Sequence, residues 1–120
     1  MIPIFRAFSE TFDKYILGVP YFSDGRYYML VDDCNKNNNI GSGSYPIDET
    51  TLAIHFPDML DSKGNKIFAS LQEDGKGGDI MQDDEYFGIA KYKDCQFVVE
   101  YEDCIDNIDN GNFEVIGIQV

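Results

Sequence analysis

The sequence is poor in the residues that build most metal and redox sites. It holds no Trp, a single histidine, His55, and three cysteines, Cys34, Cys95 and Cys104, none of them in a CxxC pair. Because zinc and iron sites use several Cys or His ligands, one chain of this composition does not supply a His-rich site. The odd cysteine count favours reduced thiols over a disulfide framework, although a hairpin would place Cys95 and Cys104 opposite each other.

Positive charge is also scarce. Nine Lys and Arg accompany 22 Asp and Glu in 120 residues, which gives a formal net charge of −13. Direct binding to DNA or RNA is not expected, because such binding depends on Lys and Arg that neutralise phosphates. No window approaches the roughly 20 apolar residues of a membrane span, and the first ten residues lack the features of a signal peptide. We therefore expect a cytoplasmic protein without membrane contact.

Motifs for phosphate or calcium binding are missing. Gly41–Ser44 is GSGS and Asp74–Asp79 is DGKGGD, and neither matches GxxxxGK[ST] or GxGxxG at the start of a helix. The acidic turn that starts at Asp106 fails the EF-hand pattern, because Ile108 occupies position 3 and Gly117 occupies position 12. These segments are interpreted as loops and solvated turns, and no cofactor or metal is expected.

The one histidine does not indicate catalysis. His55 lies between Ile54 and Phe56 in a strand-like run, without a Ser or Cys motif beside it. A lone histidine of this kind is more often a hydrogen-bonded or surface residue than a general base. Asp and Glu are so abundant that no pair of carboxylates stands out for glycoside hydrolysis. We therefore expect that the protein is not an enzyme.

The chain does contain enough apolar material for a folded core, since 43% of its residues are hydrophobic. No segment of 11 or more residues keeps an apolar period of 3.6, so helix content should be low. Short strand-like runs recur about every ten residues, with turn residues between them. These runs cover residues 2–8, 14–17, 26–31, 51–56, 79–81, 86–93, 96–101 and 113–120.

Turn-forming residues separate the runs. Gly18 and Pro20 are expected to end the second strand, and Ser23-Asp24-Gly25 predicts the turn into the third. The runs 86–93 and 96–101 are predicted to form a long hairpin joined at Lys93-Asp94-Cys95. The segment 32–46, rich in Asn, Gly and Ser, is expected to be a loop and the best place for a boundary between lobes. Asp48 is then expected to cap a short helical turn.

Three stretches resemble the YopX-type family of small phage and prophage proteins. They are IPIFRAF at residues 2–8, LDSKGNKIF with GDIM at residues 60–68 and 78–81, and FEVIG at residues 113–117. Where the family has one residue before its GD, this chain has Ala69–Gly77, and Phe8 stands where Trp is usual. The resemblance implies a phage or prophage origin and an SH3-type barrel in the C-terminal half. It implies no catalytic residues.

Together, the pattern and the resemblance predict a mainly β protein with a small-barrel architecture. The C-terminal half is expected to be an SH3-like barrel, with an N-terminal β-hairpin lobe packed on it. The chain is treated as one domain, 1–120, with possible lobes at 1–58 and 59–120. Gly64 suits a tight turn, and Gly78 suits a position of positive φ before a strand.

Two classes of function remain open. The first is a noncatalytic phage-derived protein that acts through protein contacts or self-association, with a homo-oligomer expected and exposed aromatic side chains as anchors. The candidate anchors are Tyr21, Phe22, Tyr27, Tyr28, Tyr86 and Phe87. The alternative is an acidic nucleic-acid mimic that inhibits a host DNA-binding protein, because a charge of −13 can compete for a basic groove. A mimic needs rows of carboxylates at phosphate-like spacing on one face.

Overall fold

The computed structural model describes residues 3–32, 38–83, 86–102, 105–108 and 113–120. These residues form β-strands and no α-helix, and none of them belongs to a helix that could cross a membrane. The predicted mainly β fold is confirmed. The strands are β1 (Ile4–Ser9), β2 (Lys14–Ser23), β3 (Arg26–Val31), β4 (Gly43–Pro46), β5 (Asp48–His55), β6 (Ala69–Ser70), β7 (Asp79–Gln82), β8 (Phe87–Lys93), β9 (Gln96–Glu100), β10 (Ile105–Asn107) and β11 (Glu114–Ile118).

The strands pair along one open path. Its order is β10-β9-β8-β6-β5-β1-β2-β3-β4, with β7 added to β8 and β11 added to β7. The described pairs are antiparallel except for β6 with β8, which meet in parallel at Ser70 and Lys91. No pairing among the described strands joins β4 to β10. Closure of the C-terminal strands into an SH3-type barrel stays a prediction.

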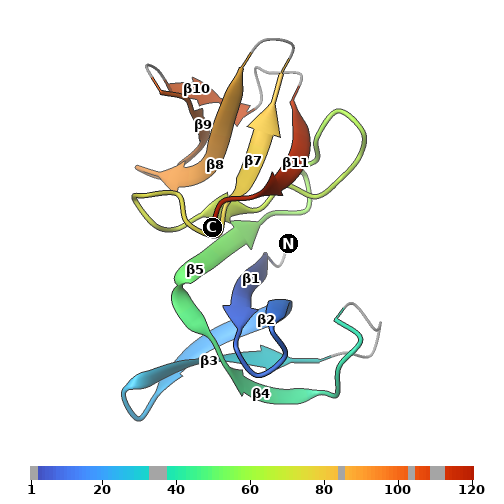
Figure 1. Cartoon of the computed structure of the whole chain (residues 1–120), viewed down its shortest axis with the longest axis vertical. Helices are drawn as coiled ribbons and strands as arrows, with labels where there is room; N and C mark the ends of the chain where they lie inside the picture. Colours follow the sequence, from blue (N-terminus) through green and yellow to red (C-terminus); the bar gives the residue numbers. More distant parts are fainter. Residues whose placement is uncertain (1–2, 33–37, 84–85, 103–104, 109–112) are drawn as a thin grey trace.

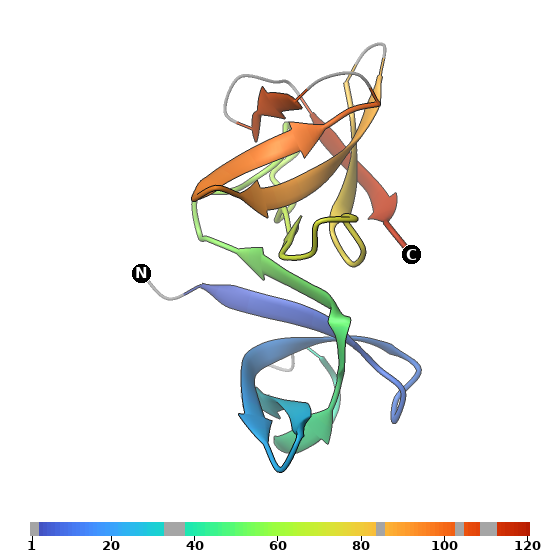
Figure 2. The same cartoon turned by 90° about the vertical axis from the view of Figure 1, so that its left-hand side faces the viewer.

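Two groups of strands lie one above the other (Figures 1 and 2). The N-terminal group contains β1 to β4, the C-terminal group contains β7 to β11, and β5 passes between them. β5 pairs with β1 on one side and with β6 on the other. Each group has its own apolar cluster. The N-terminal cluster includes the fully buried side chains of Ile16, Met29 and Val31. The C-terminal cluster is built around Ile67 and Met81.

Strand β2 is longer than the sequence pattern predicts, because it continues through Gly18 and Pro20. Its first part, up to Gly18, pairs with β1, and its second part, from Val19, pairs with β3. Pro20 therefore lies where β2 has one described partner strand, the position in a sheet that tolerates proline. At Gly18, β2 and β3 come so close that a Cβ would lie 2.4 Å from the carbonyl oxygen of Leu30.

The turns of the two long hairpins follow the sequence prediction. Asp24 and Gly25 connect β2 to β3, and Asp94 and Cys95 connect β8 to β9. Residues in both turns have positive φ: 52° and 79° in the first, and 50° and 61° in the second. Two consecutive residues of positive φ give a turn whose twist matches that of the flanking strands. The predicted turn into β3 and the predicted β8–β9 hairpin are confirmed.

The prediction of a loop throughout segment 32–46 is wrong. Its last four residues form β4, which pairs with β3. Asn38 is buried, and its amide binds both backbone groups of Leu17, accepting from the N–H at 2.6 Å and donating to the carbonyl oxygen at 2.8 Å. The apolar pattern of the sequence does not predict that Asn38 is buried, because hydrogen bonds and not apolar contacts hold its amide in the interior.

The helical turn expected after Asp48 is also absent from the described structure, because Asp48 is the first residue of β5. Its Oδ1 accepts hydrogen bonds from the backbone N–H of Thr50 at 3.0 Å and from the Thr50 hydroxyl at 2.6 Å. These bonds, led by that of the hydroxyl, lower the pKa of Asp48. The carboxylate thus binds Thr50 at the start of the strand and does not cap a helix.

The two glycines singled out from the sequence differ in their structural role. Gly64 has a φ of +83° and open space around its Cα. The positive φ expected at Gly78 is wrong, because it falls on the preceding residue, Gly77, with a φ of +82°. Gly78 is required by close packing instead, since a Cβ there would lie 2.5 Å from the carbonyl oxygen of Ala90.

Candidate protein-contact surface

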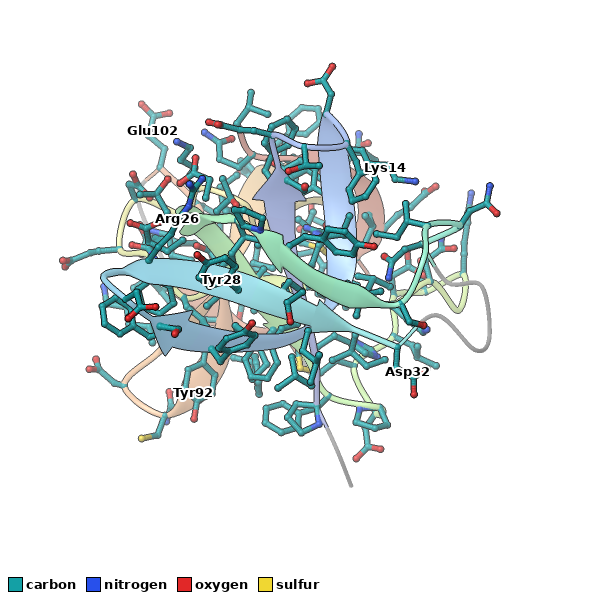
Figure 3. The ribbon with its side chains drawn as sticks, turned by 90° about the horizontal axis from the view of Figure 1, so that it is seen from below. Lys14, Arg26, Tyr28, Asp32, Tyr92 and Glu102 are labelled. Carbon is teal, nitrogen blue, oxygen red and sulfur yellow. The ribbon has the colours of Figure 1, made fainter. Side chains whose placement is uncertain are left out.

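The hairpin of β2 and β3 separates apolar side chains onto two faces. Its register places Val19 opposite Leu30 and Tyr21 opposite Tyr28. Because side chains alternate along a strand and Met29 is fully buried between Tyr28 and Leu30, these two pairs point away from the N-terminal core. We call Val19, Tyr21, Tyr28 and Leu30 the outer face. Figure 3 views this hairpin from below, with Tyr28 labelled beside β3.

The outer face is exposed although it is apolar. Val19 is 53% exposed and Leu30 is 51% exposed, and Tyr21 is also open to solvent. The rings of Tyr21 and Tyr28 stack with their centroids 5.5 Å apart and an angle of 20° between their planes. Such a cross-strand pair stabilises the hairpin by about 1 kcal/mol. The stacking also holds both rings in fixed positions, which lowers the entropy cost of a contact with a partner.

The other aromatic pair of the hairpin, Phe22 and Tyr27, lies on the opposite face near the turn. Their rings pack edge to face with centroids 5.0 Å apart, yet Phe22 is 60% exposed. Both residues line an open groove of about 730 Å³. We call it the hairpin groove. Its charged lining residues are Glu10, Arg26, Asp48 and Glu49.

The other two candidate anchors lie elsewhere. Tyr86 precedes β8 and Phe87 begins it, in the upper group of strands in Figure 1, away from the β2–β3 hairpin. Both are highly exposed. Tyr86 packs edge to face on Tyr101, with ring centroids 6.1 Å apart. The six aromatic candidates therefore divide into a group of four on one hairpin and a separate pair, and they do not form one surface.

Sequence reasoning missed Val19 and Leu30 as members of this surface. The reason is that Gly18 and Pro20 were expected to end β2, which left Val19 outside any strand. Once β2 is continued to Ser23, alternation places Val19 and Tyr21 on one face. The register with β3 then adds Leu30 to the same face.

A buried ion pair that the sequence did not indicate joins the two groups of strands. Arg6 on β1 donates to Oδ1 of Asp79 on β7 at 2.8 Å and to the carbonyl oxygen of Gly77 at 2.8 Å. Oδ2 of Asp79 accepts the backbone N–H of Phe68 at 2.7 Å. Burial raises the pKa of Asp79, against the opposing effects of Arg6 and the Phe68 amide.

The guanidinium of Arg6 also has aromatic contacts. Its central carbon lies 4.4 Å from the ring centroid of Phe68 and 5.5 Å from that of Tyr15. Such cation–π contacts favour a charged group that has left water. Every polar contact named for Arg6 and Asp79 is internal, and both side chains are about nine-tenths buried or more. The pair therefore connects the N-terminal and C-terminal groups of strands inside the protein.

His55 is enclosed in the same region. It is 1% exposed, and its Nδ1 donates to the carbonyl oxygen of Ile67 at 2.9 Å. Its ring lies against Phe68, with centroids 5.3 Å apart. Desolvation lowers the pKa of His55, so the neutral ring is the stable form. His55 was expected to be a hydrogen-bonded or a surface residue, and the structure shows the hydrogen-bonded alternative.

Asp61 is a second buried carboxylate with a structural role. Its Oδ1 accepts the N–H groups of Lys63 and Asn65 at 2.9 and 2.8 Å. Its Oδ2 accepts the N–H of Val115 at 2.9 Å and the side-chain amide of Asn65 at 3.1 Å. These bonds outweigh the effect of desolvation and lower the pKa of Asp61. The carboxylate thereby ties the 61–65 turn to β11.

The described part of the chain contains one of the three cysteines. Cys95 is an exposed free thiol in the β8–β9 turn. Cys34 and Cys104 lie outside the described residues, and so does the Cys95–Cys104 pairing considered from the sequence. Within the part of the chain that the structure describes, no group of three or more His, Cys, Asp and Glu side chains is arranged to hold a metal ion.

Comparison of the chain with models of protein families found no match. Comparisons with curated proteins and with solved structures also found none. The candidate surface is therefore defined by the geometry of this chain alone.

Proposed function

We propose that this chain is a noncatalytic protein that acts through protein–protein contacts or self-association, with the outer face as its contact surface. The observation that carries the proposal is the pairing of exposed apolar residues across β2 and β3. Val19 and Leu30 are each about half exposed and lie directly opposite each other, beside the stacked rings of Tyr21 and Tyr28. Contiguous exposed apolar residues of this kind typically mark contact sites.

The surroundings of the titratable groups support the noncatalytic part of the proposal. A general base has to reach the proton that it abstracts. The named polar contacts of His55 and Asp79 are to backbone and side-chain groups of the chain itself, and both residues are 1% exposed. These hydrogen bonds are made inside the fold, which supports a structural role for both groups.

A phage or prophage origin and an SH3-type barrel belong to the same proposal. The origin rests on the resemblance of residues 2–8, 60–68, 78–81 and 113–117 to the YopX-type family. The barrel is supported by the antiparallel series β7-β8-β9 and by the return of β11 to pair with β7. Small barrels of this type leave loops and sheet edges available for partners.

The test is the double variant Val19→Ser/Leu30→Ser, compared with the wild type by size-exclusion chromatography with light scattering and by capture from a bacterial lysate. Both measurements are made at low and at high salt. Leu60→Ser/Ile116→Ser is the matched control, because it removes two exposed apolar side chains from other parts of the surface. We expect a salt-resistant complex or homo-oligomer that the outer-face variant loses and the control keeps, because apolar contacts are not screened by ions.

The opposite result would favour the acidic nucleic-acid mimic. In that case the captured proteins would be DNA-handling proteins, and salt would release them because exposed charges are screened. Val19→Ser/Leu30→Ser would then have no more effect than the control pair. A monomer without a salt-resistant partner would also contradict the proposed contact role.

A further inference from the structure

The hairpin groove brings aromatic rings and carboxylates together from three parts of the N-terminal half. Phe22 and Tyr27 come from the β2–β3 hairpin, Glu10 comes from the β1–β2 turn, and Asp48 and Glu49 come from the start of β5. The groove is open, with a volume of about 730 Å³. That volume lies within the range of ligand pockets, and the opening gives an extended segment access to it.

The charge of the groove is negative. Three carboxylates and one guanidinium line it. Asp48 is already engaged by Thr50 and lies 3.7 Å from the ammonium of Lys76. Glu10 and Glu49 are both exposed and take part in no ion pair among the described residues. These two carboxylates are therefore available to a ligand.

The aromatic wall favours the same kind of ligand as the carboxylates do. Phe22 is 60% exposed at the groove and Tyr27 packs against it edge to face. The face of an aromatic ring carries partial negative charge and attracts a guanidinium or ammonium group. A guanidinium that lies on such a ring can still donate hydrogen bonds to a carboxylate, because its N–H groups lie in its own plane. Ring and carboxylates together therefore select for a cationic side chain.

We propose that the hairpin groove binds an arginine- or lysine-bearing segment of a protein partner. The cation would lie against Phe22 and donate to Glu10 or Glu49. A second copy of this chain is a poor occupant of this groove, because the groove requires a cation and the chain has only nine Lys and Arg against 22 Asp and Glu. This inference rests on the proposed contact function and adds the chemistry of the partner to it.

Arg26 also lines the groove and opposes such a ligand. Its positive charge reduces the attraction for a cation, so removal of that charge should strengthen binding. Arg26 is exposed, which makes Arg26→Gln a substitution that leaves the core intact. A gain in affinity from this variant is a result that loss of folding cannot mimic.

The experiment measures binding of a fluorescein-labelled arginine-containing peptide by fluorescence anisotropy at physiological ionic strength. The same peptide with citrulline in place of arginine is the probe control. We expect Glu10→Gln/Glu49→Gln to weaken binding about tenfold, and Phe22→Leu to weaken it about fivefold. Arg26→Gln should strengthen it severalfold, and the citrulline peptide should bind far more weakly.

Two matched variants separate the groove from the general acidity of the chain. Asp94→Asn/Glu102→Gln removes two exposed carboxylates of the C-terminal half, and Phe87→Leu replaces an equally exposed ring there. We expect each to change affinity less than about twofold. The two carboxylates are distant exposed charges that salt screens, and Phe87 lies outside the hairpin groove. Far-ultraviolet circular dichroism shows whether each variant is folded. Chemical-shift changes at Glu10, Phe22 and Glu49 in the wild-type protein locate the binding site without any substitution.

Any of four results would overturn the inference. They are equal losses of affinity in the groove and control variants, an unchanged affinity in Phe22→Leu, equal binding of the citrulline peptide, and no binding of the arginine peptide. The proposed contact function is tested separately by Val19→Ser/Leu30→Ser on the outer face. If that variant loses a salt-resistant partner while the groove variants behave like their controls, only the inference about the groove fails. If both sets behave like their controls, both proposals fail.

Discussion

Arg6 and Asp79 are 73 positions apart in the chain, and their side chains meet at 2.8 Å inside the protein. Arg6 belongs to β1 in the N-terminal group of strands and Asp79 begins β7 in the C-terminal group. Together with the bond from Arg6 to the Gly77 carbonyl oxygen, this ion pair is a polar connection between two groups whose apolar clusters are separate. The relative position of the two groups therefore depends on one buried pair as well as on the β1–β5–β6 ladder.

Removal of Arg6 should be strongly destabilising. Arg6→Met keeps the apolar contacts near Phe68 but leaves the Asp79 carboxylate buried without its cation, which costs about 3–5 kcal/mol. Urea denaturation at neutral pH measures the loss. Arg6→Met/Asp79→Asn should cost less than the sum of the two single variants, because the uncompensated charge is gone. Strict additivity in this cycle would contradict the coupling.

The cost of Arg6→Met should also depend on pH. Burial raises the pKa of Asp79, so the folded state holds this proton more tightly than the unfolded state does. The contribution of this carboxyl to stability therefore falls as the pH rises from the unfolded pKa, about 4, through the higher folded pKa. Arg6→Met removes the opposing charge and should steepen this fall. Urea midpoints of both proteins from acidic to neutral pH test this, and parallel curves would show that Asp79 does not titrate in this way.

Asp61 should contribute to acid sensitivity with the opposite sign. Its hydrogen bonds lower its pKa, so the stability it provides is present above the unfolded pKa and is lost as the pH falls through the folded pKa. Asp61→Asn places an amide group against N–H donors and should cost about 2 kcal/mol at neutral pH. The variant should then lose less stability than the wild type on acidification. Asp58→Asn, at an exposed neighbouring position, is the control and should leave the stability at neutral pH unchanged.

Gly64 and Gly78 should respond differently to alanine. At Gly64 only the positive φ opposes a side chain, so Gly64→Ala should cost about 1 kcal/mol. At Gly78 the new methyl group would lie 2.5 Å from the Ala90 carbonyl oxygen and 2.9 Å from Ser70. Gly78→Ala should therefore cost about 3 kcal/mol, because the β7–β8 backbone has to move. Thermal denaturation ranks the two variants, and the reverse order would contradict the close packing at Gly78.

Cys95 offers a stabilising substitution. It has a φ of 61° and follows Asp94, which also has a positive φ. Asp-Gly is preferred over other pairs in such two-residue turns, so Cys95→Gly should raise stability by about 0.5 kcal/mol. The same substitution removes an exposed thiol. A lower melting temperature than that of the wild type would show that this turn is not strained.

The sequence predicted the strands that alternate or carry clear turn residues. Asp24-Gly25 marked the β2–β3 hairpin, and the aromatic and β-branched runs marked β3, β8 and β9. It failed where hydrogen bonds or pairing geometry decide the structure. Pro20 is accommodated only because β2 changes partner strand beside it, and Asn38 is buried only because its amide binds Leu17. Neither relationship is local in sequence.

The candidate contact surface was predictable only in part, because its geometry also depends on how the strands pair. Residue type alone points to Tyr21 and Tyr28 as contact residues, and their stacking follows from a register that the turn determines. Val19 and Leu30 required knowledge of which face Met29 buries. Arg6 and Asp79 were not identified, because nothing local in an apolar strand indicates which distant carboxylate an inward-pointing arginine meets.

The most direct test of the contact role is site-specific photo-crosslinking. A photoreactive phenylalanine analogue at Tyr21 samples the outer face, and the same analogue at Leu60, an exposed position outside it, serves as control. The proposed function predicts crosslinks from position 21, to a partner or to a second copy, that persist at high salt, and none above background from position 60. Equal crosslinking from both positions, or crosslinks from position 21 that vanish at high salt, would contradict an apolar contact surface on the β2–β3 hairpin.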